Sequence, residues 1–270
     1  IFLLLFNYSF SQETVFELLN ANQTGVEFNN IIEDKKEHNI LLYANYYGGG
    51  GVGIADFDND GLQDIYFGGN LVADKIYRNL GDFKFTDKTQ SSGILDNGSW
   101  SSGITIADIN NDGLVDVYVS KELYDDKPEL RRNKLYINKG DFTFEESSKK
   151  WGVDVSARTR HAVFFDYNND GYLDLYLLNQ PPNPGSYSKF FGADLTLPEY
   201  SLQLFKNTGN NSFIDVTQEA GLKRTGFPNS VVASDLNQDG YVDLYVANDF
   251  DAPDFLYYNN GDGTFSYETE

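Results

Sequence analysis

The chain has 270 residues, of which 40% are hydrophobic and 16% aromatic, so it can bury a sizeable core and is not a disordered tail. Asp and Glu number 41 against 20 Lys and Arg, and the resulting net charge of −21 argues against nucleic acid or anionic lipid as partners. The absence of cysteine excludes a disulfide framework, a thiolate zinc site and a cysteine nucleophile.

The first residues indicate export. Residues 1–6 form an uncharged apolar run, and the small residues Ser9 and Ser11 follow it, as at the end of a signal peptide. The run is too short for a membrane span, which needs about 20 apolar residues; the alternative is a buried first strand. We expect residues 1–11 to be the remnant of an export signal, with Gln12 as the mature start and an extracellular, cell-surface or periplasmic location.

One acidic motif, Dx[DN]xDGxxD, recurs four times along the chain. The copies are DFDNDGLQD from Asp56, DINNDGLVD from Asp108, DYNNDGYLD from Asp166 and DLNQDGYVD from Asp235. Their period of about 50 to 70 residues is close to that of all-β blade repeats and differs from that of helical solenoids.

Strand-like runs surround every copy of the motif. An apolar or alternating run precedes it, a β-branched and aromatic run follows it, and a third run ends in Asn before a turn. A fourth run begins at Phe85, Phe144, Phe213 or Phe265. Four short strands per repeat predict an all-β fold, a β-propeller of four-stranded antiparallel blades. We expect about four blades of a larger propeller, at about 48–93, 94–152, 153–221 and 222–270.

Residues 12–47 are expected to form an N-terminal segment that contains a lone outer strand. Within this segment, FELLNANQTGV (16–26) matches the fourth run and the Gly-aliphatic pair that follows it in the repeats, with one extra residue. In a closed propeller, such an N-terminal strand commonly completes the last blade and hides the sheet edges.

The acidic loops have the oxygen donors of a Ca²⁺ site. Positions 1, 3, 5 and 9 carry Asp or Asn, position 7 offers a backbone carbonyl, and position 6 is always Gly, which allows the sharp turn. Without a cation, the clustered carboxylates would repel one another. The predicted ligands of about four Ca²⁺ sites are Asp56, Asp58, Asp60, Leu62 and Asp64; Asp108, Asn110, Asp112, Leu114 and Asp116; Asp166, Asn168, Asp170, Tyr172 and Asp174; and Asp235, Asn237, Asp239, Tyr241 and Asp243.

Two alternatives fit the loops less well. An EF-hand needs flanking helices and a Glu at position 12, where this chain has Phe67, Val119, Leu177 and Val246. Mg²⁺ prefers a strict octahedron and retained waters.

From about residue 26 onward the chain resembles the FG-GAP/VCBS repeats of integrin α-subunit propellers, cartilage acidic protein, ASPIC/UnbV-type proteins and bacterial exported VCBS-repeat proteins. The resemblance rests most on GGGGVGIADFDNDGLQDIYFGGN (48–70) followed by KIYRNLGDFKFTDKT (75–89). It implies a β-propeller, often seven-bladed, with Ca²⁺ between strands 1 and 2 of a blade and a role in adhesion or binding outside the cell. Asn110, Asn168 and Asn237 depart from the usual Asp and lower the ligand charge of their loops relative to Asp58.

The face opposite the acidic loops is expected to bind the partner. The long connections at 121–132 and 181–200 join strands 2 and 3, so they lie on that face together with the junctions between blades. Aromatic and Arg side chains on loops are common recognition anchors. The candidates are Trp100, Arg131, Arg132, Arg158, Arg160, His161, Tyr187, Phe190, Phe191 and Tyr200.

The favoured function is a Ca²⁺-stabilised binding or adhesion module for a protein or glycan outside the cytoplasm, rather than an enzyme. Only His38 and His161 offer imidazoles, and neither lies in a known nucleophile motif. The alternatives are a carbohydrate-active enzyme or its sugar-binding propeller domain, because carboxylates are abundant, and a purely structural spacer.

Overall fold

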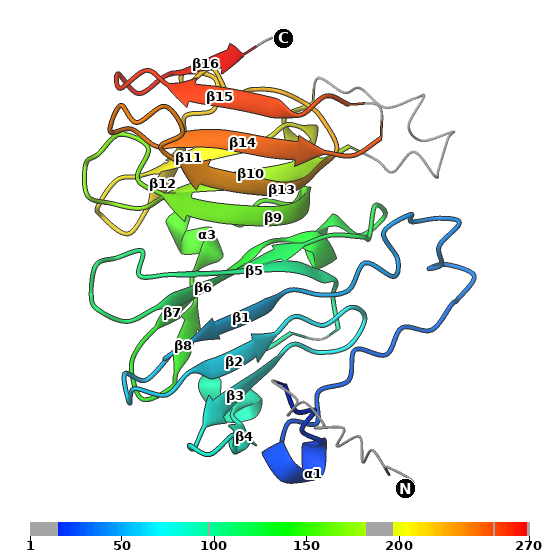
Figure 1. Ribbon diagram of the computed structural model, residues 1–270. Coiled ribbons are helices and arrows are strands. Elements are labelled where there is room, and N and C mark those ends of the chain that lie inside the picture. The colour runs from blue at the N-terminus through cyan, green and yellow to red at the C-terminus, as the bar shows by residue number, and fades with distance from the viewer. Residues whose placement is uncertain (1–15, 97, 182–196, 251, 269–270) are drawn as a thin grey trace, which may run out of the picture.

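The computed structural model describes residues 16–96, 98–181, 197–250 and 252–268. The expected export remnant at residues 1–11 lies outside them. The described chain forms four antiparallel sheets of four strands each, and in every sheet the strands are neighbours in sequence order (Figure 1). The predicted fold class, an all-β protein of four-stranded propeller-like blades, is confirmed.

The strands follow the predicted runs closely. The first sheet contains β1 (Val52–Ala55), β2 (Asp64–Phe67), β3 (Lys75–Asn79) and β4 (Phe85–Asp87). The second contains β5 (Ser101–Ala107), β6 (Asp116–Lys121), β7 (Lys134–Asn138) and β8 (Phe144–Glu146). The third contains β9 (Arg158–Phe165), β10 (Asp174–Gln180), β11 (Gln203–Asn207) and β12 (Phe213–Asp215). The fourth contains β13 (Pro228–Ser234), β14 (Asp243–Asn248), β15 (Phe255–Asn259) and β16 (Phe265–Glu268).

Helices in the described part of the chain are short. They are α1 (Ala21–Thr24), α2 (Thr89–Ser92) and α3 (Ser148–Trp151), with 3-10 turns at Pro128–Arg131 and Pro198–Tyr200. No helix in this part has the length and hydropathy of a membrane span.

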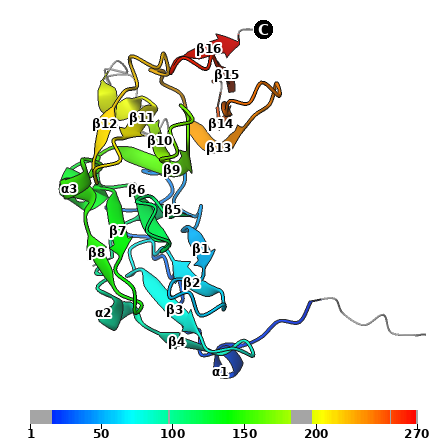
Figure 2. The ribbon, with the colours of Figure 1, turned by 90° about the vertical axis from the view of Figure 1, so that its left-hand side faces the viewer.

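Seen from the side, the sheets follow one another along a curved row (Figure 2). Their first strands β1, β5, β9 and β13 are neighbours along this row. Glycine allows the close approach of β1 and β5: a Cβ at Gly51 would lie 2.5 Å from the backbone N of Ile104. The sheets therefore pack face to face with little space between their backbones.

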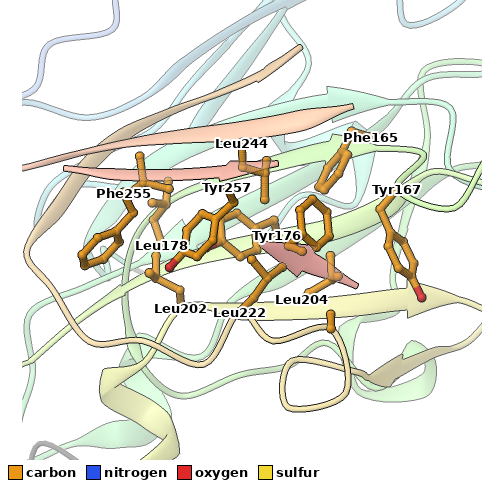
Figure 3. Close-up of a cluster of buried hydrophobic side chains, with 13 residues drawn as sticks. Phe165, Tyr167, Tyr176, Leu178, Leu202, Leu204, Leu222, Leu244, Phe255 and Tyr257 are labelled. Atoms are coloured by element: carbon orange, nitrogen blue, oxygen red, sulfur yellow. The ribbon is translucent and has the colours of Figure 1, made fainter. Parts of the chain in front are cut away.

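The core consists of apolar side chains between consecutive sheets. Between the third and fourth sheets, Tyr176, Leu204, Leu244 and Tyr257 are fully buried (Figure 3). Similar clusters lie between the other pairs of sheets. Each sheet thus buries its faces against its neighbours, as stacked blades do.

The lone outer strand expected within residues 16–26 is absent from the structure. Residues 16–20 are irregular, and the short helix α1 follows, with Asn20 and Gln23 forming a capping box. A strand needs a partner for its backbone N–H and C=O groups, and no described strand pairs with these residues.

The match between this segment and the repeats lies instead in the turn after each fourth strand. Gly25 ends α1 with a φ of 81°, just as Gly93 ends α2 with a φ of 83°. A Cβ at Gly25 would lie 2.4 Å from the carbonyl oxygen of Phe85, and one at Gly93 would lie 2.6 Å from that of Phe144. The helix α1 therefore lies against the first sheet as α2 lies against the second.

Candidate metal centre

The four acidic motifs form the connections between the first and second strands of the four sheets. In each loop the position-1 Asp accepts hydrogen bonds from the backbone N–H groups of positions 5 and 6. In the first loop Asp60 N lies 3.0 Å from Asp56 Oδ1 and Gly61 N lies 2.7 Å from Asp56 Oδ2. The same pair of bonds occurs at Asp108, Asp166 and Asp235.

Position 5 orders the second half of each loop. Its carboxylate accepts a hydrogen bond from the backbone N–H of position 7, at 2.9 Å between Leu62 and Asp60. The remaining pairs are Leu114 with Asp112, Tyr172 with Asp170, and Tyr241 with Asp239. The four loops therefore share one backbone shape, and their position-6 glycines all have a positive φ.

The position-9 aspartates are buried at the first residue of the second strand. Asp64 accepts hydrogen bonds from the backbone N–H of Phe57 at 2.8 Å and of Asn79 at 2.7 Å. Asp116, Asp174 and Asp243 have the equivalent two donors. Burial raises the pKa of Asp64 to about 6, and the pKa of Asp116 and of Asp174 to about 7.

The first loop gathers three carboxylates. Asp56, Asp58 and Asp64 each offer an oxygen, and these oxygens lie within 4.8 Å of one another. Asp58 Oδ1 is buried and has no hydrogen-bond partner in the part of the chain that the structure describes. An orphaned buried oxygen beside two other carboxylates is the environment that a hard divalent cation satisfies, so these residues fit Ca²⁺.

In the other three loops an amide replaces the carboxylate at position 3. Asn110 Nδ2 donates to Asp112 Oδ2 at 2.8 Å, and Asn110 Oδ1 accepts from Asp112 N at 3.1 Å. Asn168 and Asn237 make the same two bonds with Asp170 and Asp239. These loops contain oxygen donors in the same order as the first, with one negative charge fewer.

Two basic residues beside the loops were not predicted from the sequence. Arg78 lies across the first loop, with Nε 2.6 Å from Asp58 Oδ2 and Nη2 3.1 Å from Asp60 Oδ2. Lys206, at the same place in the third sheet, lies 3.3 Å from Asp170 Oδ2. In the sequence, each of these two residues directly precedes the Asn that ends a third strand, and this shared position could have identified them.

Two expected anchors of the partner face are buried. Trp100 is fully buried and packs edge-on against Tyr43 and stacked against Tyr46, because the N-terminal segment covers it. Arg158 is 7% exposed and donates through Nε to Asp125 Oδ1 at 2.8 Å. The expectation that these two side chains are exposed recognition anchors is wrong for this structure.

The remaining arginines on this face are held in ion pairs. Arg131 pairs with Asp125 at 3.1 Å and Arg132 with Asp154 at 3.0 Å. Arg160 lies 3.3 Å from the buried Glu122, which also accepts a hydrogen bond from the hydroxyl of Tyr43. Burial first, and then the neighbouring Glu122, raise the pKa of Tyr43 well above its usual value.

The other four aromatic candidates and His161 differ in whether the structure describes them. Tyr187, Phe190 and Phe191 lie outside the described residues, whereas Tyr200 is half-buried at the end of a 3-10 turn. His161 is half-buried in β9, with its Nδ1 near Gly103 of β5.

A hollow of about 320 Å³ opens between the N-terminal segment and the connection from β6 to β7. Its lining includes His38, Leu42, Tyr124 and Asp126. Because β5, β6 and β7 run antiparallel, this connection lies at the opposite end of the sheet from the second acidic loop.

Comparison with known proteins gives consistent matches. A family model described as an FG-GAP-like repeat matches residues 56–119, 125–177 and 193–246, together more than half of the chain. Cartilage acidic protein 1 of Homo sapiens is 23% identical over 206 residues, 76% of this chain and 29% of that protein. The Xenopus tropicalis protein of that name is 27% identical over 136 residues, 50% of this chain and 20% of that protein.

The chain spans less than a third of the length of these curated relatives. Among solved structures, the V. cholerae biofilm matrix protein Bap1 aligns with a TM-score of 0.40 and 15% identity, over 83% of this chain and 30% of Bap1.

Proposed function

Because this chain belongs to the FG-GAP-like repeat family, we propose that it is an exported Ca²⁺-binding propeller module that serves in adhesion or ligand binding. In this proposal Ca²⁺ is structural, and the partner, a protein or a glycan outside the cytoplasm, binds the face opposite the acidic loops. The observation that carries the proposal is the first loop, where three carboxylates converge and Asp58 Oδ1 is buried without a hydrogen-bond partner among the described residues.

Each loop would hold its ion with the oxygens of positions 1, 3, 5 and 9 and the backbone carbonyl of position 7. Ca²⁺ supplies positive charge at the point where the carboxylates would otherwise repel one another. The chain's own contribution is to fix the loop, since its Asp side chains already accept the backbone N–H groups of positions 5, 6 and 7.

Removal of Ca²⁺ tests the metal part of the proposal. An ion at a hundred times its Kd stabilises the folded state by about 2.7 kcal/mol per independent site. We therefore expect EDTA to lower the melting temperature strongly, and Asp60→Ala to lower it less, because it affects one loop. Glu219→Ala, which removes an exposed carboxylate outside the loops, is the control and keeps the full response to EDTA. A melting curve that EDTA leaves unchanged would contradict the metal site.

The partner site is proposed at the hollow beside the connection from β6 to β7. Its lining combines aromatic, aliphatic and acidic side chains, and Arg132, which belongs to the same connection, has a side chain that is 48% exposed. Such mixed surfaces with aromatic and Arg groups are typical of recognition sites.

The surroundings of the two histidines fit a binding module. The ring of His38 packs edge-on against Tyr124 in the lining of the hollow, and Nδ1 of His161 lies near Gly103. His38 is therefore part of the proposed partner site, whereas His161 packs between β9 and β5.

Immobilised glycans and extracellular-matrix proteins are suitable probes of this face. The site is supported if the wild-type protein retains a probe and the double variant Tyr124→Ala with Arg132→Ala loses it. Lys139→Ala, on the acidic-loop face, is the control and should keep the probe. Equal retention by both variants would contradict the site. Release of new reducing ends from a glycan probe would favour the enzyme alternative.

A further inference from the structure

Neighbouring acidic loops are joined by asparagine side chains at position 4. Asn59 Nδ2 donates to the carbonyl oxygen of Gly113, the position-6 residue of the second loop, at 3.1 Å. Asn111 reaches Gly171 of the third loop at 3.1 Å, and Asn169 reaches Gly240 of the fourth at 3.2 Å. The three donors, Asn59, Asn111 and Asn169, have φ angles between 55° and 58°, which aims each side chain sideways toward the next sheet.

A second set of bonds runs in the opposite direction through the Asn that ends a third strand. Asn138 Nδ2 donates to the carbonyl oxygen of Phe57 in the first loop at 2.8 Å. The equivalent pairs are Asn207 with Ile109 at 2.9 Å and Asn259 with Tyr167 at 2.7 Å. Asn138, Asn207 and Asn259 are at most 2% exposed, so water cannot easily replace these bonds.

The second set connects the position-9 aspartates of successive loops. Phe57 donates its N–H to Asp64 and accepts at its carbonyl from Asn138. Asn138 in turn donates its backbone N–H to Asp116 at 2.8 Å. The same order of donors and acceptors continues through the third and fourth loops, so a chain of hydrogen bonds runs from Asp64 to Asp243.

We propose that the four acidic loops bind Ca²⁺ as one coupled array, in which an ion in one loop raises the affinity of the adjacent loops through these lateral hydrogen bonds. This inference rests on the proposed Ca²⁺ binding. Closing a loop around an ion fixes its position-2 and position-6 carbonyls, which are the acceptors for the neighbouring sheets. The neighbouring loop then has less conformational freedom to lose when it binds its own ion, and this produces positive cooperativity.

Site-resolved amide hydrogen exchange tests the coupling. The protection of each loop is followed against free Ca²⁺ in the intact chain, with and without Asp112→Asn, which weakens the second loop while preserving its size. When the position-4 asparagines are intact, we expect Asp112→Asn to raise the free Ca²⁺ concentration at the midpoint of protection in the first and third loops. The rise should be about fivefold or more, since coupling free energies typically correspond to at least this factor. The fourth loop, which is not adjacent, should shift less.

The lateral bonds are then weakened at position 4. The triple variant Asn59→Gly, Asn111→Gly and Asn169→Gly removes the amides and retains the positive φ. Asn211→Gly, with a φ of 58° in the hairpin between β11 and β12, is the matched control. The shift caused by Asp112→Asn should shrink in the triple variant and remain full in the control.

Two results overturn the coupling. In the first, the wild type shows Ca²⁺-dependent protection, but the first and third loops keep their midpoints within about twofold when the second is weakened. In the second, Asp112→Asn shifts the protection midpoints of the first and third loops as much in the triple variant as in the control. If no loop gains protection with Ca²⁺, the proposed Ca²⁺ binding fails and the coupling fails with it, a result distinct from four loops that fill independently.

Discussion

At the scale of single residues, Arg78 offsets part of the negative charge of the first acidic loop. It lies beside Asp58 and Asp60, where its positive charge opposes a second cation. We expect Arg78→Gln to raise the Ca²⁺ affinity of the first loop by up to about fivefold, since partly exposed ion pairs contribute about 0.2–1 kcal/mol, and to lower the melting temperature in EDTA. Calorimetric titration of the variant checks this. Lys75→Gln, which breaks a pair with Asp87 away from the loop, should leave the affinity unchanged.

His161 makes a contribution of known sign to the pH dependence of stability. Burial first, and then Arg160, hold the pKa of His161 below its usual value of 6.5. The unfolded chain therefore binds this proton more readily, so the contribution of His161 to the free energy of unfolding should fall as the pH drops through 6.5 toward the lower folded pKa. The buried Asp64, Asp116 and Asp174, whose pKa values are raised, contribute with the opposite sign in the same range, so the test compares two proteins. Urea unfolding between pH 8 and 5 should show that His161→Gln gains stability relative to the wild type as the pH falls; a constant difference would exclude this role of His161.

The sequence reveals the residues of the acidic loops better than the surroundings of the candidates on the opposite face. The spacing within Dx[DN]xDGxxD defines a loop by itself, so Asp56 to Asp64 could be aligned with three other copies. The burial of Trp100 depends on Tyr43 and Tyr46, which lie in a segment without periodic pattern. A contact between such distant residues leaves no local signal.

At the scale of secondary-structure elements, Gly51 allows the backbones of the first and second sheets to approach each other closely. Its missing Cβ would lie 2.5 Å from the backbone N of Ile104, and a backbone atom cannot rotate away. We expect Gly51→Ala to lower the free energy of unfolding by about 1–3 kcal/mol, as overpacking does. At Gly53 a Cβ would meet the side-chain ends of Ile106 and Ile104 instead, so Gly53→Ala should cost less and Ile106→Val should restore part of the loss. Urea denaturation of the variants decides whether the order is as stated.

Strands were predictable at the scale of elements because each is bounded by a local signal. β4, β8, β12 and β16 begin at the four predicted phenylalanines. The segment 16–26 has the same local signals and still lacks a strand, because strand formation also requires a pairing edge. Its match to the repeats was real, but it describes the helical turn that ends at Gly25.

At the scale of the whole molecule, the sheets are joined by the buried apolar residue at position 2 of the first three loops. Phe57 is fully buried and packs edge-on against Phe142 and Phe144 of the second sheet. Leu236, at the same position in the fourth loop, is 46% exposed. We expect Phe57→Ala to lower the free energy of unfolding by about 3–5 kcal/mol and Leu236→Ala by less than about 0.5 kcal/mol.

Chemical denaturation monitored by circular dichroism measures both values. Equal losses in the two variants would show that position 2 does not act through the neighbouring sheet.

The lateral bonds between loops have a consequence for how such chains evolve. Every one of them ends on a main-chain carbonyl, and none depends on which side chain the neighbouring repeat carries at that point. For these hydrogen bonds, one repeat can therefore replace another. Gene duplication or recombination can then lengthen or reorder the row without any matched change in these bonds at the new junction, provided that the asparagines are copied along with it, and only the apolar packing between the sheets has to be matched.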